Sequence, residues 1–151
     1  DLIPILLTQV YQGKKVALFG STNKELTVAR QKLESQNVQV VTVLDGFREP
    51  DVYVQHLANL EVDLVVMAMG MPKQEAVSKM ICATYPNIST INGGAIVDFI
   101  AGKVERAPEW VQKLSLEWAY RLMKEPKRLF NRYVIGNVTF LTRAMIVKLS
   151  G

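Results

Sequence analysis

Four short segments rich in aliphatic and β-branched residues recur along the chain, and each ends at a glycine or another turn residue. They are Lys15–Phe19, Val38–Leu44, Leu64–Ala68 and Ile88–Ile91. Stretches of helical length and period lie between them, namely Asn23–Ser35, Asp51–Asn59 and Lys73–Tyr85. Strands that alternate with helices join by right-handed crossovers into a parallel sheet covered on both faces. The pattern therefore predicts an α/β, Rossmann-like fold.

The pattern changes after Asp98, where apolar residues recur with helical spacing only. Pro108 and Pro126 stand where two of these helices would start, because proline is favoured in the first turn. We therefore expect two parts: residues 1–102 form the α/β domain, and residues 103–151 form an all-α appendage.

Charge is distributed unevenly between these two parts. Residues 1–102 carry eight Lys/Arg and ten Asp/Glu, a net charge of −2, whereas residues 103–151 carry ten and four, a net charge of +6. Such asymmetry indicates an anionic partner for the appendage, which could be phospholipid headgroups, a diphosphate or nucleic acid.

The sequence also excludes some classes of site. With one cysteine and one histidine, the chain can form neither an intrachain disulfide nor a metal site built from thiolates or several histidines. We interpret Cys82 as a core residue and His56 as a solvated residue of a surface helix. No uninterrupted apolar run approaches the roughly 20 residues that span a bilayer, and the first residues do not resemble a signal peptide. We expect a soluble or peripheral protein in a reducing cytoplasm.

Glycines gather at the ends of the predicted strands. In an open parallel sheet, ligands bind at the carboxyl ends of the strands, where glycine lets the backbone approach a ligand and helix amino termini attract phosphate. A nucleotide diphosphate would fit there, although glycines also simply terminate strands. No GxGxxG or Walker A motif is present. The segments are Gly20-Ser-Thr, Leu44-Asp-Gly-Phe, Gly70-Met-Pro-Lys-Gln and Asn92-Gly-Gly.

Two charged residues at this edge suggest a ligand. Pro72 is expected at the first helical position, with Lys73 and Gln74 in the first turn. A cation there opposes the helix dipole, so an anionic ligand explains Lys73 better than a solvated surface position does. Asp98 lies among apolar neighbours, where a carboxylate costs free energy unless it is paired or binds something. It either caps a helix or accepts hydrogen bonds from a base or sugar.

At these same positions the sequence resembles the WecG/TagA/CpsF family of glycosyltransferases. The resemblance extends in family order over essentially the whole chain. The matching strings are Asp1-Leu-Ile-Pro, Gly70-Met-Pro-Lys-Gln-Glu, Gly93-Gly-Ala-Ile-Val-Asp-Phe-Ile-Ala-Gly-Lys-Val, Arg106-Ala-Pro-Glu-Trp, Leu116-Glu-Trp-Ala-Tyr-Arg-Leu-Met-Lys-Glu-Pro-Lys-Arg-Leu and Arg132-Tyr-Val-Ile-Gly-Asn.

The resemblance implies an inverting transfer of an N-acetylmannosamine-type sugar from a UDP donor to an undecaprenyl-diphosphate-linked acceptor, in teichoic acid or surface polysaccharide synthesis. It implies no metal, and we expect no other cofactor. The protein would act in the cytoplasm, peripheral to the inner face of the cell membrane, with an anionic membrane surface but no nucleic acid as a partner. A homo-oligomer is left open.

The resemblance also assigns site residues. Asp98 matches a position near the uracil, Phe47 stands where an aromatic ring stacks on the base, and tail arginines match those that grip the acceptor diphosphate. The aspartate implied as general base is expected upstream of this chain, so the catalytic residue within the chain is unknown. The expected donor-binding residues are Gly20, Phe47, Pro72, Lys73, Gln74, Gly93, Gly94 and Asp98, and the expected acceptor-binding residues are Arg121, Arg128 and Arg132.

Apolar residues recur at every fourth position in the appendage: Trp110, Leu114, Trp118 and Leu122. This stripe fits core packing or membrane insertion, and packing is the commoner use of such a stripe. Basic residues that follow it would also hold the protein at an anionic leaflet, since each contributes up to about 1 kcal/mol. An alternative function is a noncatalytic nucleotide-binding module with a basic nucleic-acid-binding tail, where aromatics beside arginines would also serve.

Overall fold

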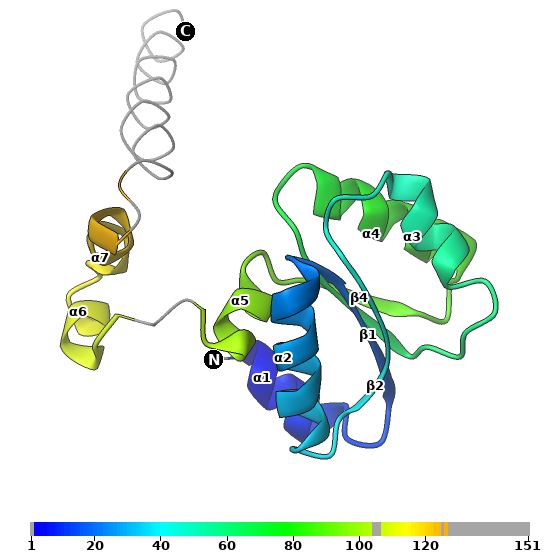
Figure 1. The fold of residues 1–151 in the computed structure, drawn as a ribbon, viewed down its shortest axis with the longest axis horizontal. Helices are drawn as coiled ribbons and strands as arrows, with labels where there is room; N and C mark the ends of the chain where they lie inside the picture. The colour runs from blue at the N-terminus through cyan, green and yellow to red at the C-terminus, as the bar shows by residue number, and fades with distance from the viewer. Residues whose placement is uncertain (1, 104–106, 125, 127–151) are drawn as a thin grey trace, which may run out of the picture. The chain divides into compact units, whose positions relative to one another are not determined.

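The computed structural model describes residues 2–103, 107–124 and 126 (Figure 1), and the chain divides into two units, Asp1–Glu105 and Arg106–Gly151. The first unit alternates strands and helices, as the sequence predicts. Its elements are α1 (Leu2–Ile5), the π-helix η1 (Leu6–Val10), β1 (Lys15–Gly20), α2 (Asn23–Glu34), β2 (Gln39–Leu44), α3 (Pro50–His56), β3 (Leu64–Ala68), α4 (Lys73–Thr84), β4 (Ser89–Asn92) and α5 (Ile96–Ala101).

The four strands form one parallel sheet in the order β2-β1-β3-β4. β1 and β3 lie at its centre, and the register pairs Val16 of β1 with Leu64 of β3. The chain adds β2 on one side of β1 and then returns to add β3 and β4 on the other side. This topology, together with the helices around it, confirms the predicted α/β, Rossmann-like class. It also creates a switch point between the ends of β1 and β3, where α/β proteins place their ligands.

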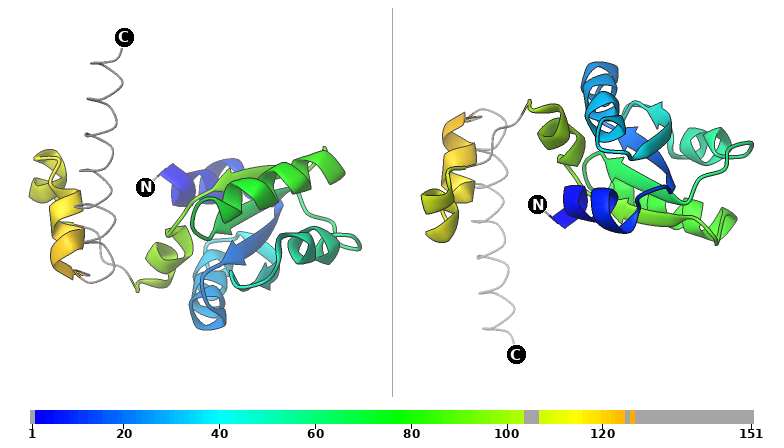
Figure 2. Two further views of the ribbon diagram at one scale, coloured as in Figure 1. Left: turned by 90° about the horizontal axis from the view of Figure 1, so that it is seen from above. Right: turned by 90° about the horizontal axis from the view of Figure 1, so that it is seen from below.

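Helices cover both faces of the sheet (Figure 2), and each face has its own apolar core. On one face α2, α5 and η1 pack against alternate residues of β1 and β3, with Leu26 and Leu33 of α2 fully buried. On the other face α3 and α4 pack against the intervening residues, including Phe19 and Met67. All five residues of β3 are buried, because a central parallel strand has no solvent-facing side.

The structure corrects two details of the sequence interpretation. Cys82 is exposed rather than in the core, because α4 turns Val77 and Ile81 toward the sheet and the next residue lies about 100° further round the helix. α3 ends at His56 and not at Asn59, because the amide of Leu57 turns back to the carbonyl of Val54, three residues earlier.

A third correction concerns Pro72, which was expected at the first helical position but precedes α4, because its ψ of 3° lies outside the helical range. The expectation for His56 agrees with the structure. His56 is exposed, and its Nε2 lies 2.7 Å from Thr42 Oγ1.

The described part of the second unit contains α6 (Glu109–Lys113) and α7 (Glu117–Lys124). A turn separates them, with Ser115 at φ 58°, so the expected apolar stripe does not run along a single helix. Core packing of the stripe is wrong for its first three members, since Trp110, Leu114 and Trp118 are 64%, 61% and 52% exposed. No helix among the described residues is long and apolar enough to cross a membrane.

Candidate functional site

Four loops follow the carboxyl ends of the strands, and together we call them the crest: residues 20–22, 45–49, 69–72 and 92–95. They connect β1 to α2, β2 to α3, β3 to α4 and β4 to α5. All eight expected donor-binding residues lie in these loops or in the first turn of the helix that follows. Hydrogen bonds between loops bring several of them together.

The β1–α2 loop lies directly against the end of β3. Gly20 has φ 126°, and a Cβ at that position would lie 2.3 Å from the carbonyl carbon of Ala68. The next amide, that of Ser21, donates to the Ala68 carbonyl oxygen at 3.0 Å. Gly20 therefore allows two backbones to meet at the switch point, where no side chain would fit.

Asp98 lies in the first turn of α5 and is half-buried. Its Oδ1 accepts a hydrogen bond from the Ser21 hydroxyl at 2.5 Å, and no side chain caps the start of α5. Asp98 therefore does not cap α5, which was one of the two roles that the sequence suggested for it. Asp98 and Ser21 are 77 positions apart in the sequence, and their contact joins the β4–α5 loop to the β1–α2 loop.

Gln74 joins the β3–α4 and β4–α5 sides of the crest. Its side chain is 7% exposed, and its Oε1 accepts from the amide of Gly94 at 3.3 Å. Gly94 has φ 58°, in the left-handed region, and a Cβ there would meet nothing within 4 Å. At Gly93, in contrast, a Cβ would lie 2.4 Å from the Ile96 side chain, so this glycine is required for close packing. The open space beside Gly94 leaves its backbone approachable.

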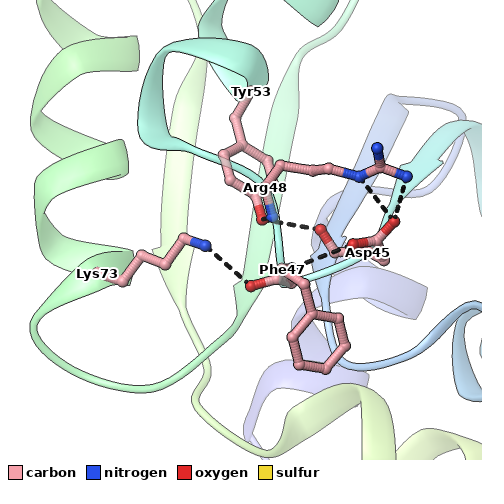
Figure 3. Close-up of polar contacts among 6 residues, drawn as sticks. Asp45, Phe47, Arg48, Tyr53 and Lys73 are labelled. Atoms are coloured by element: carbon pink, nitrogen blue, oxygen red, sulfur yellow. Dashed lines mark hydrogen bonds and ion pairs between the residues drawn. The ribbon is translucent and has the colours of Figure 1, made fainter.

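Lys73 bridges two loops of the crest (Figure 3). Its Nζ donates to the carbonyl oxygen of Gly46 at 3.0 Å and lies 5.4 Å from the centroid of the Tyr53 ring. The ammonium group thus has one partner in the β2–α3 loop and one in α3. These contacts place a positive charge at the start of α4, beside the loop that carries Phe47.

The sequence interpretation missed a polar network around Asp45. Asp45 is 7% exposed, and its Oδ2 accepts two hydrogen bonds from Arg48, at 3.0 Å from Nε and 2.9 Å from Nη2. These bonds hold the pKa of Asp45 below its usual value, although burial acts in the opposite direction. The sequence did contain a signal for this network, because an acid and a base three residues apart, Asp45 and Arg48, flank Gly46-Phe47.

Tyr53 completes this network from α3. Its ring is fully buried, and its hydroxyl donates to the Asp45 carbonyl oxygen at 2.8 Å and accepts from the Arg48 amide at 3.2 Å. Burial raises the pKa of the Tyr53 hydroxyl further above neutral pH. Phe47 is 76% exposed at the tip of the same loop. An apolar ring thus projects from a loop whose backbone is firmly held.

The appendage side of the predicted site is largely outside the described residues. Arg121 lies in α7, where only its backbone is described, and Arg128 and Arg132 lie outside the described residues altogether. Within residues 2–103, 107–124 and 126, no group of three or more His, Cys, Asp or Glu side chains is arranged to hold a metal ion.

A hollow of about 490 Å³ lies at the opposite edge of the sheet, beside the start of β1. Its charged residues are already paired, since Lys15 contacts both Glu61 and, through its amide, Asp63. At the crest, in contrast, polar side chains from different loops lie near one another, and not all of them form ion pairs.

Comparison with known families identifies the family of the chain. The sequence model described as the glycosyl transferase WecG/TagA/CpsF family matches residues 1–151, which is the whole chain. The strings that carry the resemblance, including Gly70-Met-Pro-Lys-Gln-Glu, therefore lie inside a match of full extent. The chain belongs to the WecG/TagA/CpsF family, whose members are glycosyltransferases of cell-surface polysaccharide synthesis.

Proposed function

We propose that this protein transfers an N-acetylmannosamine-type sugar, with inversion, from a UDP donor bound at the crest to an undecaprenyl-diphosphate-linked acceptor. Membership of the family supports a sugar-nucleotide donor and a lipid-linked acceptor in general. The observation that carries the proposal for the donor is a series of hydrogen bonds across the crest, beside the switch point of the sheet. The amide of Gly46, next to Phe47, donates to the Ser21 carbonyl, the Ser21 hydroxyl donates to Asp98, and the amide of Gly94 donates to Gln74.

The nucleoside end of the donor fits the region of Asp98 and Phe47. Uracil has one strong N–H donor and an aromatic face, so a carboxylate and an exposed ring provide the two complementary contacts. Ser21 holds one oxygen of Asp98 in a fixed direction, which lowers the entropy lost when a base binds. The carboxylate of Asp98 then selects for a ring N–H over a ring acceptor.

The diphosphate fits the start of α4 and the neighbouring Gly93-Gly94 turn. The amide groups that open a helix of 12 residues attract phosphate, and the charge of Lys73 adds to this field. A site of this kind stabilises the negative charge that develops on UDP as the sugar departs.

Transfer with inversion needs a general base to take the proton of the acceptor hydroxyl as the hydroxyl oxygen attacks the anomeric carbon and the bond to UDP breaks. The resemblance implies an aspartate for this step, and we assign no base within residues 1–151.

The second unit would bring the protein to its acceptor at the inner face of the membrane. Trp110, Trp118 and Met123 are exposed, and residues 103–151 carry a net charge of +6. Aromatic side chains favour the interface of a bilayer, and each Lys or Arg near an anionic leaflet contributes about 1 kcal/mol. Arg121, Arg128 and Arg132 would bind the acceptor diphosphate, because a guanidinium group pairs with phosphate through two parallel hydrogen bonds.

Calorimetry with UDP tests the donor site. Asp98→Asn keeps the shape of the side chain but removes its charge, and we expect UDP affinity to fall about tenfold, since a hydrogen bond to a charged group contributes about 1.5–3 kcal/mol. Asp51→Asn, an exposed acid of α3, is the matched control and should leave affinity unchanged. Equal affinity of the Asp98→Asn variant and the unsubstituted protein would remove Asp98 from the donor site.

A second measurement tests the class of function. If the protein ignores UDP but binds single-stranded nucleic acid with a steep salt dependence, the transferase proposal fails and the nucleic-acid alternative replaces it. Sedimentation with vesicles that contain undecaprenyl diphosphate tests the acceptor, with vesicles of the same net charge that lack this lipid as the control.

A further inference from the structure

Several backbone groups of the β2–α3 loop form hydrogen bonds within the protein, although the loop lies on the surface. The amide of Gly46 donates to the Ser21 carbonyl at 3.0 Å, and its carbonyl accepts from Lys73 at 3.0 Å. The amide of Phe47 donates to Asp45 Oδ1 at 3.1 Å. The amide of Arg48 donates to the hydroxyl of the buried Tyr53, as described above. Surface loops usually leave such groups to water.

The tip of this loop does not pack against the rest of the protein. Phe47 is the residue that these contacts surround, yet its ring is 76% exposed. Fixing an exposed apolar ring gives no core burial, so the contacts of Asp45, Arg48 and Tyr53 are not explained by the stability of the ring itself. A ring carried on a fixed backbone does, however, bind a planar ligand with less loss of conformational entropy than a ring on a mobile loop does.

We propose that Asp45, Arg48 and Tyr53 are positioning residues, which hold the Phe47 ring as a preformed surface for the base of the donor. This inference rests on the proposed donor site and extends it to three residues that do not themselves contact the ligand. Asp45 is the centre of the arrangement, because it receives both the Arg48 guanidinium and the Phe47 amide (Figure 3).

The ion pair between Asp45 and Arg48 helps to hold the β2–α3 loop in place. The Arg48 guanidinium lowers the pKa of the Asp45 carboxyl, and the hydrogen bonds to Asp45 raise the pKa of Arg48 in turn. Two hydrogen bonds from one guanidinium fix the direction of the carboxylate, which a single ammonium donor would not do. Lys73 supports the loop from the other side through the Gly46 carbonyl, so the loop is held between α3 and α4.

The test compares ligands with and without a base. We expect Phe47→Ala to weaken UDP binding about ten- to a hundredfold, the range for loss of one base–aromatic stack. Asp45→Asn, which leaves Phe47 in place, should weaken UDP binding about three- to tenfold, because the loop that carries the ring becomes more mobile. Neither variant should change the affinity of inorganic pyrophosphate, which has no base, and calorimetry measures both ligands. Asp51→Asn is the control for loss of one acidic charge near the same loop.

A second variant separates positioning from a general loss of structure. Arg48→Met removes the guanidinium from an exposed position and should reproduce the effect of Asp45→Asn, whereas Arg48→Lys should restore part of the UDP affinity. Hydrogen exchange at the Phe47 and Arg48 amides should speed up in the variants that lose UDP affinity.

The outcomes distinguish this inference from the proposed function. Equal loss of UDP and pyrophosphate binding in Asp45→Asn and Arg48→Met would show a general structural defect and overturn the positioning role. Faster exchange at the loop amides with unchanged UDP affinity would also overturn it and leave the donor site intact. If the unsubstituted protein does not bind UDP, the proposed function fails and this inference fails with it.

Discussion

The core of the α/β unit and the helices of the described second unit differ in how far their large apolar side chains are exposed. In the α/β unit Phe19, Leu18 and Tyr53 are fully buried, whereas Trp110, Trp118 and Met123 of the described second unit are 64%, 52% and 77% exposed. The first unit carries a net charge of −2 over residues 1–102, and the rest of the chain carries +6. The first arrangement gives a packed base for the loops of the crest, and the second leaves large apolar side chains of α6 and α7 exposed.

The largest expected effect is on the core of the first unit. Leu18 belongs to the core between β1 and α2 and has no exposed surface. Leu18→Ala should lower the free energy of unfolding by about 3 kcal/mol, because it removes apolar contacts and leaves a cavity. Urea denaturation followed by circular dichroism measures this change. A loss below about 1 kcal/mol is typical of an exposed position. Such a result would contradict the burial of Leu18, on which the difference between the two units depends.

An intermediate effect is expected from acid, through Asp45. Its pKa is lowered in the folded state, so its stabilising contribution is complete above the unfolded-state pKa of about 3.9 and is lost as the pH falls through the lower folded-state value. The difference in unfolding free energy between the unsubstituted protein and Asp45→Asn should therefore be constant above about pH 5 and shrink toward zero at lower pH.

Urea titrations of both proteins between neutral pH and about pH 3 measure this difference. Other acids with lowered pKa, such as Glu25 and Glu61, occur in both proteins, and their effects cancel in the subtraction. A difference that grows on acidification would contradict the ionised, paired state of Asp45.

The smallest effect on stability is expected in the second unit. Trp118→Ala should change the free energy of unfolding by less than about 0.5 kcal/mol, as exposed substitutions usually do. The same variant should weaken binding to anionic vesicles several-fold, since tryptophan favours the bilayer interface. Met80→Ala, at an exposed position of α4, is the control that should leave vesicle binding unchanged. A loss of stability as large as that of Leu18→Ala would show that Trp118 is a core residue.

Local pattern was sufficient for much of the fold. The four strands and the helices α2, α3 and α4 begin and end within a few residues of their predicted bounds, because the periodicity of apolar residues and the position of glycine are properties of short segments. No bounds were predicted for α1, η1 or α5. The same pattern placed Gly20, Gly94 and Lys73 at the carboxyl edge of the sheet, since in a parallel sheet all strands end on one side. Cys82 was misplaced because an apolar type does not reveal which face of a helix it occupies.

By itself, the sequence determined the α/β class, the crest and the basic appendage, which depend on local periodicity and composition. Only the tertiary structure decided that Ser21 meets Asp98, that Gln74 meets Gly94, and that Lys73 reaches the β2–α3 loop. These pairs are separated by 77, 20 and 27 positions, and crossover connections bring them together. A linear pattern contains no record of such contacts, because they depend on the order in which the strands assemble and on the side of the sheet that each helix covers.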